Sequence, residues 1–499
     1  MVVSVSEPRI VSPASAPTTP ASVPTPSASS PSPSPGPAGA PGLSRLGLAT
    51  VLLGAALPFL DFFIVNVALP TIDRDLDAGP AVLEMVVGGY GVAYAVLLVL
   101  GGRLGDMVGR RRLFLWGTAA FGVTSVACGL APDAWTLVVA RIAQGASAAL
   151  MLPQVLATIQ ATTHGARRTR ALSLYSGTAG VVSAVGQVLG GVLVSVDALG
   201  WRSIFLINAP IVAVALLLAV RSVPETRSDR PTGVDGWGTV LLSLTLVSLL
   251  VPLTEGRSTG WPLWSWLLLA VFPCAAVAFV LVERREERAG RTPLVPPSLL
   301  RVQAVRSGLT LAVPFCIGWG GFMFVLAVAL QEGLRLGPLE AGLALVPMCV
   351  TFLVGSLGGV RLAARFGARR LVTGGTLVQG AGLVTVAATF WFGWDGLGAL
   401  GLAPGLAVQG LGQGLVMPLT MRLVLGEVPV AQAGVGSGVL VTTQQAFMAL
   451  GVATLGSLFL SLAPGSGMRD ALAITFAVQV VTVVATGLLS LRLPRGTAA

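Results

Sequence analysis

The ten residues 103–112 read RLGDMVGRRR, and residues 361–370 read RLAARFGARR. Each stretch follows a long apolar run and precedes another, and the two align without gaps. A Gln-Gly pair followed by a proline also recurs at one internal spacing, as Gln144-Gly145 with Pro153 and as Gln409-Gly410 with Pro418. This parallel repeat predicts two related halves of six helices each, an arrangement that is common among membrane transporters.

The composition of the chain is that of an integral membrane protein. Hydrophobic residues make up 54% of the 499 residues and charged residues only 10%, whereas a soluble domain carries about 25% charged residues. So few charges cannot cover the surface of a globule of this length, so most of that surface must face lipid. We therefore expect an all-α membrane protein.

The apolar runs predict fourteen membrane-spanning helices, because a helix needs about 20 residues to cross the hydrocarbon core. The predicted spans are 46–69, 83–102, 113–131, 134–158, 171–195, 203–220, 237–254, 263–282, 308–331, 339–360, 371–392, 397–420, 434–462 and 471–491.

The basic residues support this count. All 31 are arginines, and with the N-terminus in the cytoplasm most of them fall in cytoplasmic segments, as the positive-inside rule requires. The exceptions are Arg74, Arg202, Arg257, Arg335 and Arg469 in outer segments and Arg141 within a span. Both termini are thus expected in the cytoplasm of a bacterial cell, with the chain in the cytoplasmic membrane.

The spans and the repeat together predict four regions. Residues 1–42 form a Pro/Ser-rich tail without an apolar core or a basic start, so we expect disorder and no signal peptide. Residues 43–220 form a six-helix bundle, 221–304 a linker with two additional spans, and 305–499 a second six-helix bundle with a short cytoplasmic tail.

Several chemistries are excluded by residue types that the chain lacks. There is no lysine for a Walker A phosphate loop or a Schiff base. The single histidine, His164, argues against histidine metal clusters and Ser-His-Asp triads. The four cysteines lie in apolar stretches as small hydrophobic residues. We expect no metal, no cofactor, no enzymatic activity and, because the arginines sit in short loops, no nucleic-acid partner.

Asp61 is the carboxylate that lies deepest within a predicted span, and Arg141 is the one arginine within a span. Each lies about seven residues from the outer end of its helix, or roughly 10 Å below the outer boundary at 1.5 Å per residue. An ion pair is therefore geometrically possible. Because an adjacent arginine favours the ionised acid and loss of water disfavours it, alternating access predicts proton coupling at this pair. The alternative is a permanent pair that only anchors two helices.

The chain resembles the major facilitator superfamily, specifically its fourteen-span drug:proton antiporter branch. The resemblance covers residues 45–492. Five stretches carry it: LDFFIVNVALP at 60–70, GxLxDxxGRR at 102–111, RxxQG at 141–145, GQVLGG at 186–191 and WRxxFxxNxP at 201–210.

The resemblance implies roles for two of these motifs. Gly102, Asp106, Gly109, Arg110 and Arg111 would form a gating latch that closes the inner side; the alternative is a solvated turn. The antiporter motif would comprise Gly186, Gln187, Gly190 and Gly191.

Gln187 is a departure from the pattern, since the family usually has proline there, and proline would bend the helix. This departure weakens the argument for export and keeps open a carrier of a small metabolite, working as uptake or efflux.

Polar and aromatic side chains within spans are candidates for a substrate cavity, where polar groups orient a ligand and aromatic rings supply contact area. They are Tyr90, Tyr94, Gln144, Gln154, Trp319, Gln409, Gln413, Gln444 and Gln445. With Asp61 the one deeply embedded acid found, we expect a neutral, zwitterionic or monocationic amphipathic substrate. By resemblance this is a drug or antibiotic, exported in exchange for protons by a monomer in the lipid bilayer, which confers resistance.

Overall fold

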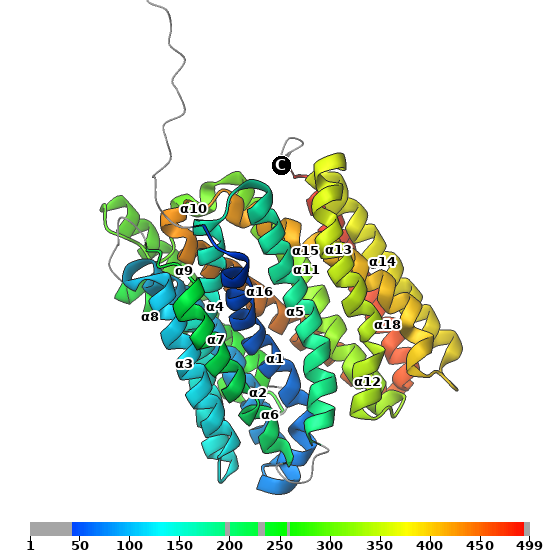
Figure 1. Cartoon of the computed structure of the whole chain (residues 1–499). Coiled ribbons are helices and arrows are strands. Elements are labelled where there is room, and N and C mark those ends of the chain that lie inside the picture. Colours follow the sequence, from blue (N-terminus) through cyan, green and yellow to red (C-terminus); the bar gives the residue numbers. More distant parts are fainter. Residues whose placement is uncertain (1–41, 195–199, 228–234, 257–259, 494–499) are drawn as a thin grey trace, which may run out of the picture. The chain divides into compact units, whose positions relative to one another are not determined.

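The structure is a computed structural model that describes residues 42–194, 200–227, 235–256 and 260–493, and these residues form α-helices and short connections (Figure 1). The expected disordered tail lies outside the described residues, apart from its last position.

The first half consists of helices packed around two apolar cores. They are α1 (Arg45–Leu76), α2 (Gly79–Val108), α3 (Arg110–Gly129), α4 (Ala134–Thr162), α5 (Gly165–Val194), the short α6 (Ser203–Leu206) and α7 (Asn208–Ser222). Helix α4 lies at the centre, against both α2 and α3, and most of its side chains are buried. Local capping sets its start, because the Asp133 carboxylate accepts the Thr136 N–H at 2.9 Å.

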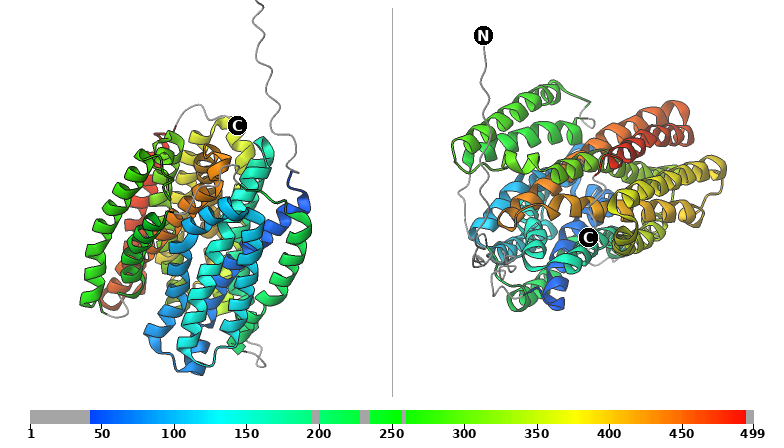
Figure 2. Two further views of the ribbon diagram at one scale, coloured as in Figure 1. Left: turned by 90° about the vertical axis from the view of Figure 1, so that its left-hand side faces the viewer. Right: turned by 90° about the horizontal axis from the view of Figure 1, so that it is seen from above.

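Two long helices, α8 (Gly236–Glu255) and α9 (Leu263–Arg288), follow as an antiparallel pair, and the short α10 (Pro297–Arg301) leads into the second half. Helix α8 contacts α2 and α16, and Figure 2 shows the pair in green at the edge of the bundle. The outer surface of the α8–α9 pair is apolar, with Trp237 of α8 and Leu263 of α9 each 74% exposed. Aromatic residues at helix ends suit the membrane–water interface.

The second half repeats the first. It comprises α11 (Gln303–Val328), α12 (Pro338–Ala344), α13 (Val346–Phe366), α14 (Ala368–Gly393), α15 (Ala403–Gly426), α16 (Ala433–Gly451), α17 (Ser457–Ser466) and α18 (Met468–Ser490). Two π-helical turns continue its helices, Ala329–Gly333 after α11 and Val452–Gly456 after α16.

Close backbone contacts recur at matching places in the two halves. A Cβ added at Gly145 would lie 2.2 Å from the Tyr90 carbonyl oxygen, and one at Gly410 would lie 2.1 Å from the Met348 carbonyl oxygen. The sharp junctions after α2 and α13 also match, because Gly109 and Gly367 both have positive φ, at 116° and 85°. The sequence repeat thus corresponds to a repeat in helix packing.

Twelve of the described helical segments are long and apolar enough to cross a membrane. The other two predicted spans are occupied by α3 and α5, which are more polar and begin with several arginines. The chain is therefore a multi-pass helical membrane protein, and the count of fourteen spans stays a prediction.

Asp75 lies beyond the first candidate span and joins the end of α1 to the short turn Gly200–Arg202 that leads into α6. Asp75 accepts hydrogen bonds from the Trp201 indole at 2.8 Å and from Arg202 at 2.5 Å. These two bonds hold the pKa of Asp75 below its usual value.

Because the folded-state pKa is lowered, this contact stabilises the fold above the ordinary pKa and loses its effect as pH falls through the folded pKa. We expect Asp75→Asn to destabilise the chain by less than about 1 kcal/mol at neutral pH, since the side chains of Asp75 and Arg202 are 46% and 34% exposed. The difference should vanish in strong acid. Thermal unfolding of both proteins over a pH series measures this, and a pH-independent difference would contradict it.

Candidate functional site

Asp61 and Arg141, which the sequence placed at equal depth, form an ion pair between α1 and α4, and both side chains have no solvent exposure. Asp61 Oδ2 accepts a hydrogen bond from Arg141, and Oδ1 accepts one from the Gln144 amide at 2.8 Å and one from the Asn208 amide at 3.1 Å. Three helices thus converge on one carboxylate, which suits its ionised form.

Arg141 is held by further contacts. Its Nε donates to the Val86 carbonyl oxygen of α2 at 3.1 Å, and a terminal nitrogen also donates to the Gln144 side-chain oxygen at 2.8 Å. Its guanidinium lies 4.2 Å from the centre of the Tyr90 ring, a cation–π geometry. Charge and position are therefore both constrained, and the pair as a whole is neutral.

Asn208 is a member of this site that the sequence did not reveal. Its amide joins Asp61 to the Ser125 hydroxyl at 2.9 Å. The Cys128 thiol likewise donates to the Gln144 side-chain oxygen at 3.4 Å. The available signal was an amide in the motif at 201–210, but sequence alone does not tell which way a side chain on α7 points.

Asp106, near the end of α2, lies against the N-terminus of α16 in the other half of the chain. Its carboxylate accepts the backbone N–H of Gly434 at 3.1 and 3.2 Å and that of Val435 at 3.4 Å. Arg110 donates to the same carboxylate at 2.8 and 3.1 Å and to the Val430 carbonyl oxygen at 2.7 Å. An acid at a helix N-terminus is favoured by the helix dipole and by the unpaired N–H groups there.

Of the other motif residues, Gly102 takes part in the contact with α16, whereas Gly109 and Arg111 act within the first half. A Cβ added at Gly102 would lie 2.1 Å from the Gly434 carbonyl oxygen, so the backbones of α2 and α16 touch. Gly109 has the positive φ that lets α3 begin directly after α2. Arg111 donates to the Val220 carbonyl oxygen at the end of α7 and so remains within its own half.

Four further hydrogen bonds, made by three side chains, join the halves on the α2/α4 side. The Gln160 amide donates to the Leu425 and Val428 carbonyl oxygens at 2.6 and 2.9 Å. Hydroxyls of α16 donate to carbonyl oxygens of the first half, Ser437 to Pro153 at 3.2 Å and Thr442 to Ala95 at 3.3 Å. Gln160 and these hydroxyls were not expected from the sequence.

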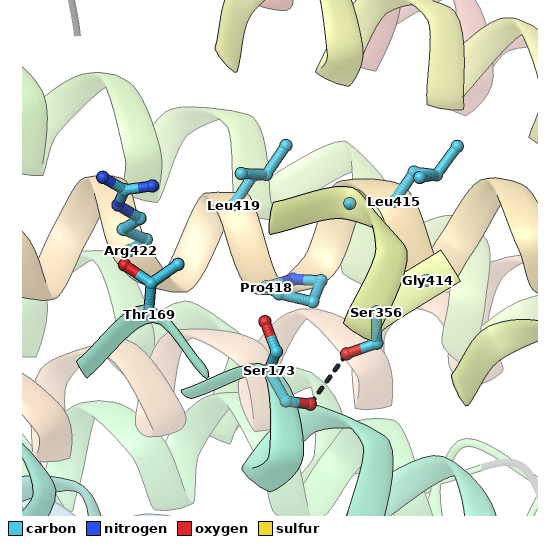
Figure 3. A pocket seen from close by; sticks show the side chains of 9 residues that line it. Thr169, Ser173, Ser356, Gly414, Leu415, Pro418, Leu419 and Arg422 are labelled. Atoms are coloured by element: carbon cyan, nitrogen blue, oxygen red, sulfur yellow. Dashed lines mark hydrogen bonds between the residues drawn. The ribbon is translucent and has the colours of Figure 1, made fainter. Parts of the chain in front are cut away.

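A small pocket lies between the halves on their other side, where α5 meets α13 and α15 (Figure 3). The Ser356 hydroxyl donates to the Ser173 carbonyl oxygen at 2.7 Å within it. Its lining residues are Thr169, Ser173, Ser356, Gly359, Gly414, Leu415, Pro418, Leu419 and Arg422. None of the expected cavity residues lines this pocket.

The expected cavity residues lie in several places. Tyr90 and Gln144 adjoin Asp61, and Tyr94 stacks on Tyr90 with ring centres 6.1 Å apart. Gln154 instead links α4 to α2 through the Gly101 carbonyl oxygen at 2.8 Å.

The candidates of the second half lie apart from Asp61. Trp319 stacks on Phe352 with ring centres 6.5 Å apart. Gln409 and Gln413 are buried, and their amide nitrogens have no hydrogen-bond partner among the described residues. Gln444 is buried and Gln445 half-buried.

The antiporter motif places a glycine beside the acid site. A Cβ added at Gly186 would lie 3.2 Å from the carbonyl oxygen of Leu60, the neighbour of Asp61, and one at Gly191 would lie 3.6 Å from Leu339 of α12. Gly190 is buried in the same helix, and the Gln187 side chain lies outside the described part. Helix α5 therefore runs from the acid site toward the second half.

Residues 51–452 match the Major Facilitator Superfamily. The chain belongs to that superfamily. It is thus a membrane transporter, and the superfamily expected from the sequence is confirmed, whereas its fourteen-span drug:proton antiporter branch stays a prediction.

Similar proteins include exporters and resistance proteins. A probable actinorhodin transporter of Streptomyces coelicolor is 38% identical over 86% of this chain and 75% of that protein. The tetracenomycin C resistance and export protein of Streptomyces glaucescens is 32% identical over 89% and 83%. The multidrug efflux pump LfrA of Mycolicibacterium smegmatis is 30% identical over 83% and 80%.

The fold also matches a solved structure of a distant superfamily member. The human organic anion transporter MFSD10 superposes with a TM-score of 0.65 over 89% of this chain and 99% of its own, at 15% identity. That similarity concerns the fold alone.

Proposed function

We propose that this major facilitator protein is a proton-driven exporter of an amphipathic drug or antibiotic and confers resistance to it. The observation that carries proton coupling is the fully buried Asp61–Arg141 pair with its amide donors Gln144 and Asn208. The names of the similar proteins support export of an antibiotic-like compound.

The electrostatics of the site require protonation and movement to be linked. While the pair is closed, three donors satisfy the Asp61 carboxylate, so a proton has no place there. A proton on Asp61 would leave the buried Arg141 charge without compensation, which is costly in a water-poor site. Proton binding therefore goes together with a loosening of the contacts between α1, α4 and α7, and substrate exchange uses that loosened state.

The latch between α2 and α16 indicates which end of the bundle must open when these contacts loosen. The Asp106 carboxylate and the contact of Gly102 with Gly434 join the halves at the end where the loops before α3, α5 and α16 lie. We place this end in the cytoplasm by the positive-inside rule, with both termini there, fourteen spans in a bacterial cytoplasmic membrane, and a monomer as the unit. Opening then requires the backbone contact to separate.

The test uses bacteria that express the chain and everted vesicles made from them, with a panel of amphipathic antibiotics. Expression should lower susceptibility to at least one compound, and the vesicles should accumulate that compound only while a proton gradient exists. A chain that sensitises cells to a compound would instead be an uptake carrier, the alternative that Gln187 keeps open. Accumulation that survives collapse of the gradient would contradict proton drive.

A further inference from the structure

Two acids of the inserted helices face each other at the end of the bundle that carries the latch. Asp235 caps α8, where its Oδ1 accepts the Gly238 N–H at 2.9 Å. Glu283 of α9 is 2% exposed, and its Oε2 accepts the Val295 N–H at 2.7 Å. The second oxygen of each, Oδ2 of Asp235 and Oε1 of Glu283, receives no hydrogen bond from any donor in the described ranges.

These two free oxygens point at the same place. A Cβ added at Gly238 would lie 2.3 Å from the Glu283 Oε1 and 2.5 Å from the Asp235 Oδ2. The two oxygens therefore lie close together beside the first turn of α8. Two ionised carboxylates so placed repel, whereas one shared proton turns one oxygen into a donor and satisfies both.

No nearby cation is paired with the two carboxylates in a way that would neutralise them in place of that proton. Arg103 of α2 is 4% exposed and lies near Glu283, Asp235 and Asp106. It forms no ion pair within 4.0 Å with these acids among the residues that the structure describes. Arg291, the other cation near Asp235, is paired with Glu286 at 2.6 Å.

We propose that Glu283 and Asp235 together bind one proton and form a second proton site of this transporter, on the inserted helices rather than in the repeated halves. The proton comes from the water at that end of the bundle and returns to it. Loss of this proton changes the net charge of the acid pair from minus one to minus two. The added charge attracts Arg103, which Asp106 of the latch also attracts, so this site links local pH to the latch. The proposal does not depend on Asp61.

The sharpest probe is infrared difference spectroscopy of the purified full chain in lipid nanodiscs, titrated from mildly acidic to mildly alkaline pH. We expect the native chain to lose a protonated-carboxyl carbonyl band that Glu283→Gln and Asp235→Asn both lack. Glu287→Gln is the matched control, because Glu287 lies one turn along α9 and accepts the Ser298 N–H at 2.8 Å instead of facing Asp235. It should keep the band.

Thermal unfolding gives an independent readout in the same samples. The melting temperature of the native chain should fall across the titration, as the shared proton is lost. Glu283→Gln should show no such fall, because its amide donates to Asp235 at every pH. A carbonyl band or a pH-dependent melting temperature that persists in Glu283→Gln would overturn the proposal. So would stabilisation of the alkaline native chain by sodium or calcium, which would identify a cation site instead.

Discussion

Asp61→Asn is expected to abolish substrate accumulation driven by a proton gradient, with a loss of at least about tenfold in the initial rate, or roughly 1.4 kcal/mol. The amide of asparagine cannot ionise, and it turns a donor either toward Arg141 or toward the amides of Gln144 and Asn208, so the proton-carrying group and the ion pair are both lost. The measurement is uptake into everted vesicles at matched expression, with and without the gradient.

Removing one charge of a buried pair also threatens folding, since an uncompensated charge costs about 3–5 kcal/mol. The control is therefore the double variant Asp61→Asn with Arg141→Gln, which removes both charges, alongside Asp61→Glu, which keeps the acid. A role in coupling predicts that the double variant folds and binds substrate but is not driven, and that Asp61→Glu retains partial drive. Normal proton-driven uptake by either asparagine variant would make the pair a helix anchor only.

Gly102→Val is expected to reduce transport by more than tenfold while leaving the melting temperature close to that of the native chain. A Cβ at this position meets the Gly434 carbonyl oxygen at 2.1 Å, and backbone cannot yield as a flexible side chain can. The contact lies between the halves, so the variant should fold but fail to close at this end.

Closure is measured by the reaction of a cysteine placed at Ser437, which is fully buried in the closed contact, with a membrane-impermeant thiol reagent. Gly91→Val is the matched control, since Gly91 lies on the same helix and a Cβ there has nothing within 4 Å. Ser437→Cys should react faster in the Gly102→Val background and at the native rate in the Gly91→Val background. Equal rates in both would show that this glycine does not limit closure.

The positions of the helices and of the acid–arginine pair could be predicted from the sequence, because both depend on distance along a helix. Span positions follow from runs of apolar residues, and the depth of Asp61 and Arg141 follows from a fixed rise per residue. The place of Asp106 came from a family resemblance, and its partner Gly434 could not be read from the residues.

The residues that were missed depend on which helices are neighbours and how each is rotated. Asn208 and Gln160 make their contacts across helices, so one sequence could not assign their partners. Glu283 was placed just beyond a predicted span because boundaries are good to only a few residues, yet it is 2% exposed. Asp61 is accordingly not the one buried acid among the long helices.

The hydrogen bonds between the halves share one property. Nearly all of them pair a side chain with a main-chain atom of the opposite half, as do those of Asp106, Arg110, Gln160, Ser356, Ser437 and Thr442. Among the described residues the exception is Ser176, which donates to the Met421 sulfur. Every residue type supplies a peptide carbonyl, so most substitutions on the receiving surface leave these bonds intact. Apart from Gly434, where a Cβ would lie 2.2 Å from the Gly102 carbonyl oxygen, each half is therefore free to change the side chains at these positions, as a carrier needs when its cargo changes but its mechanical cycle must not.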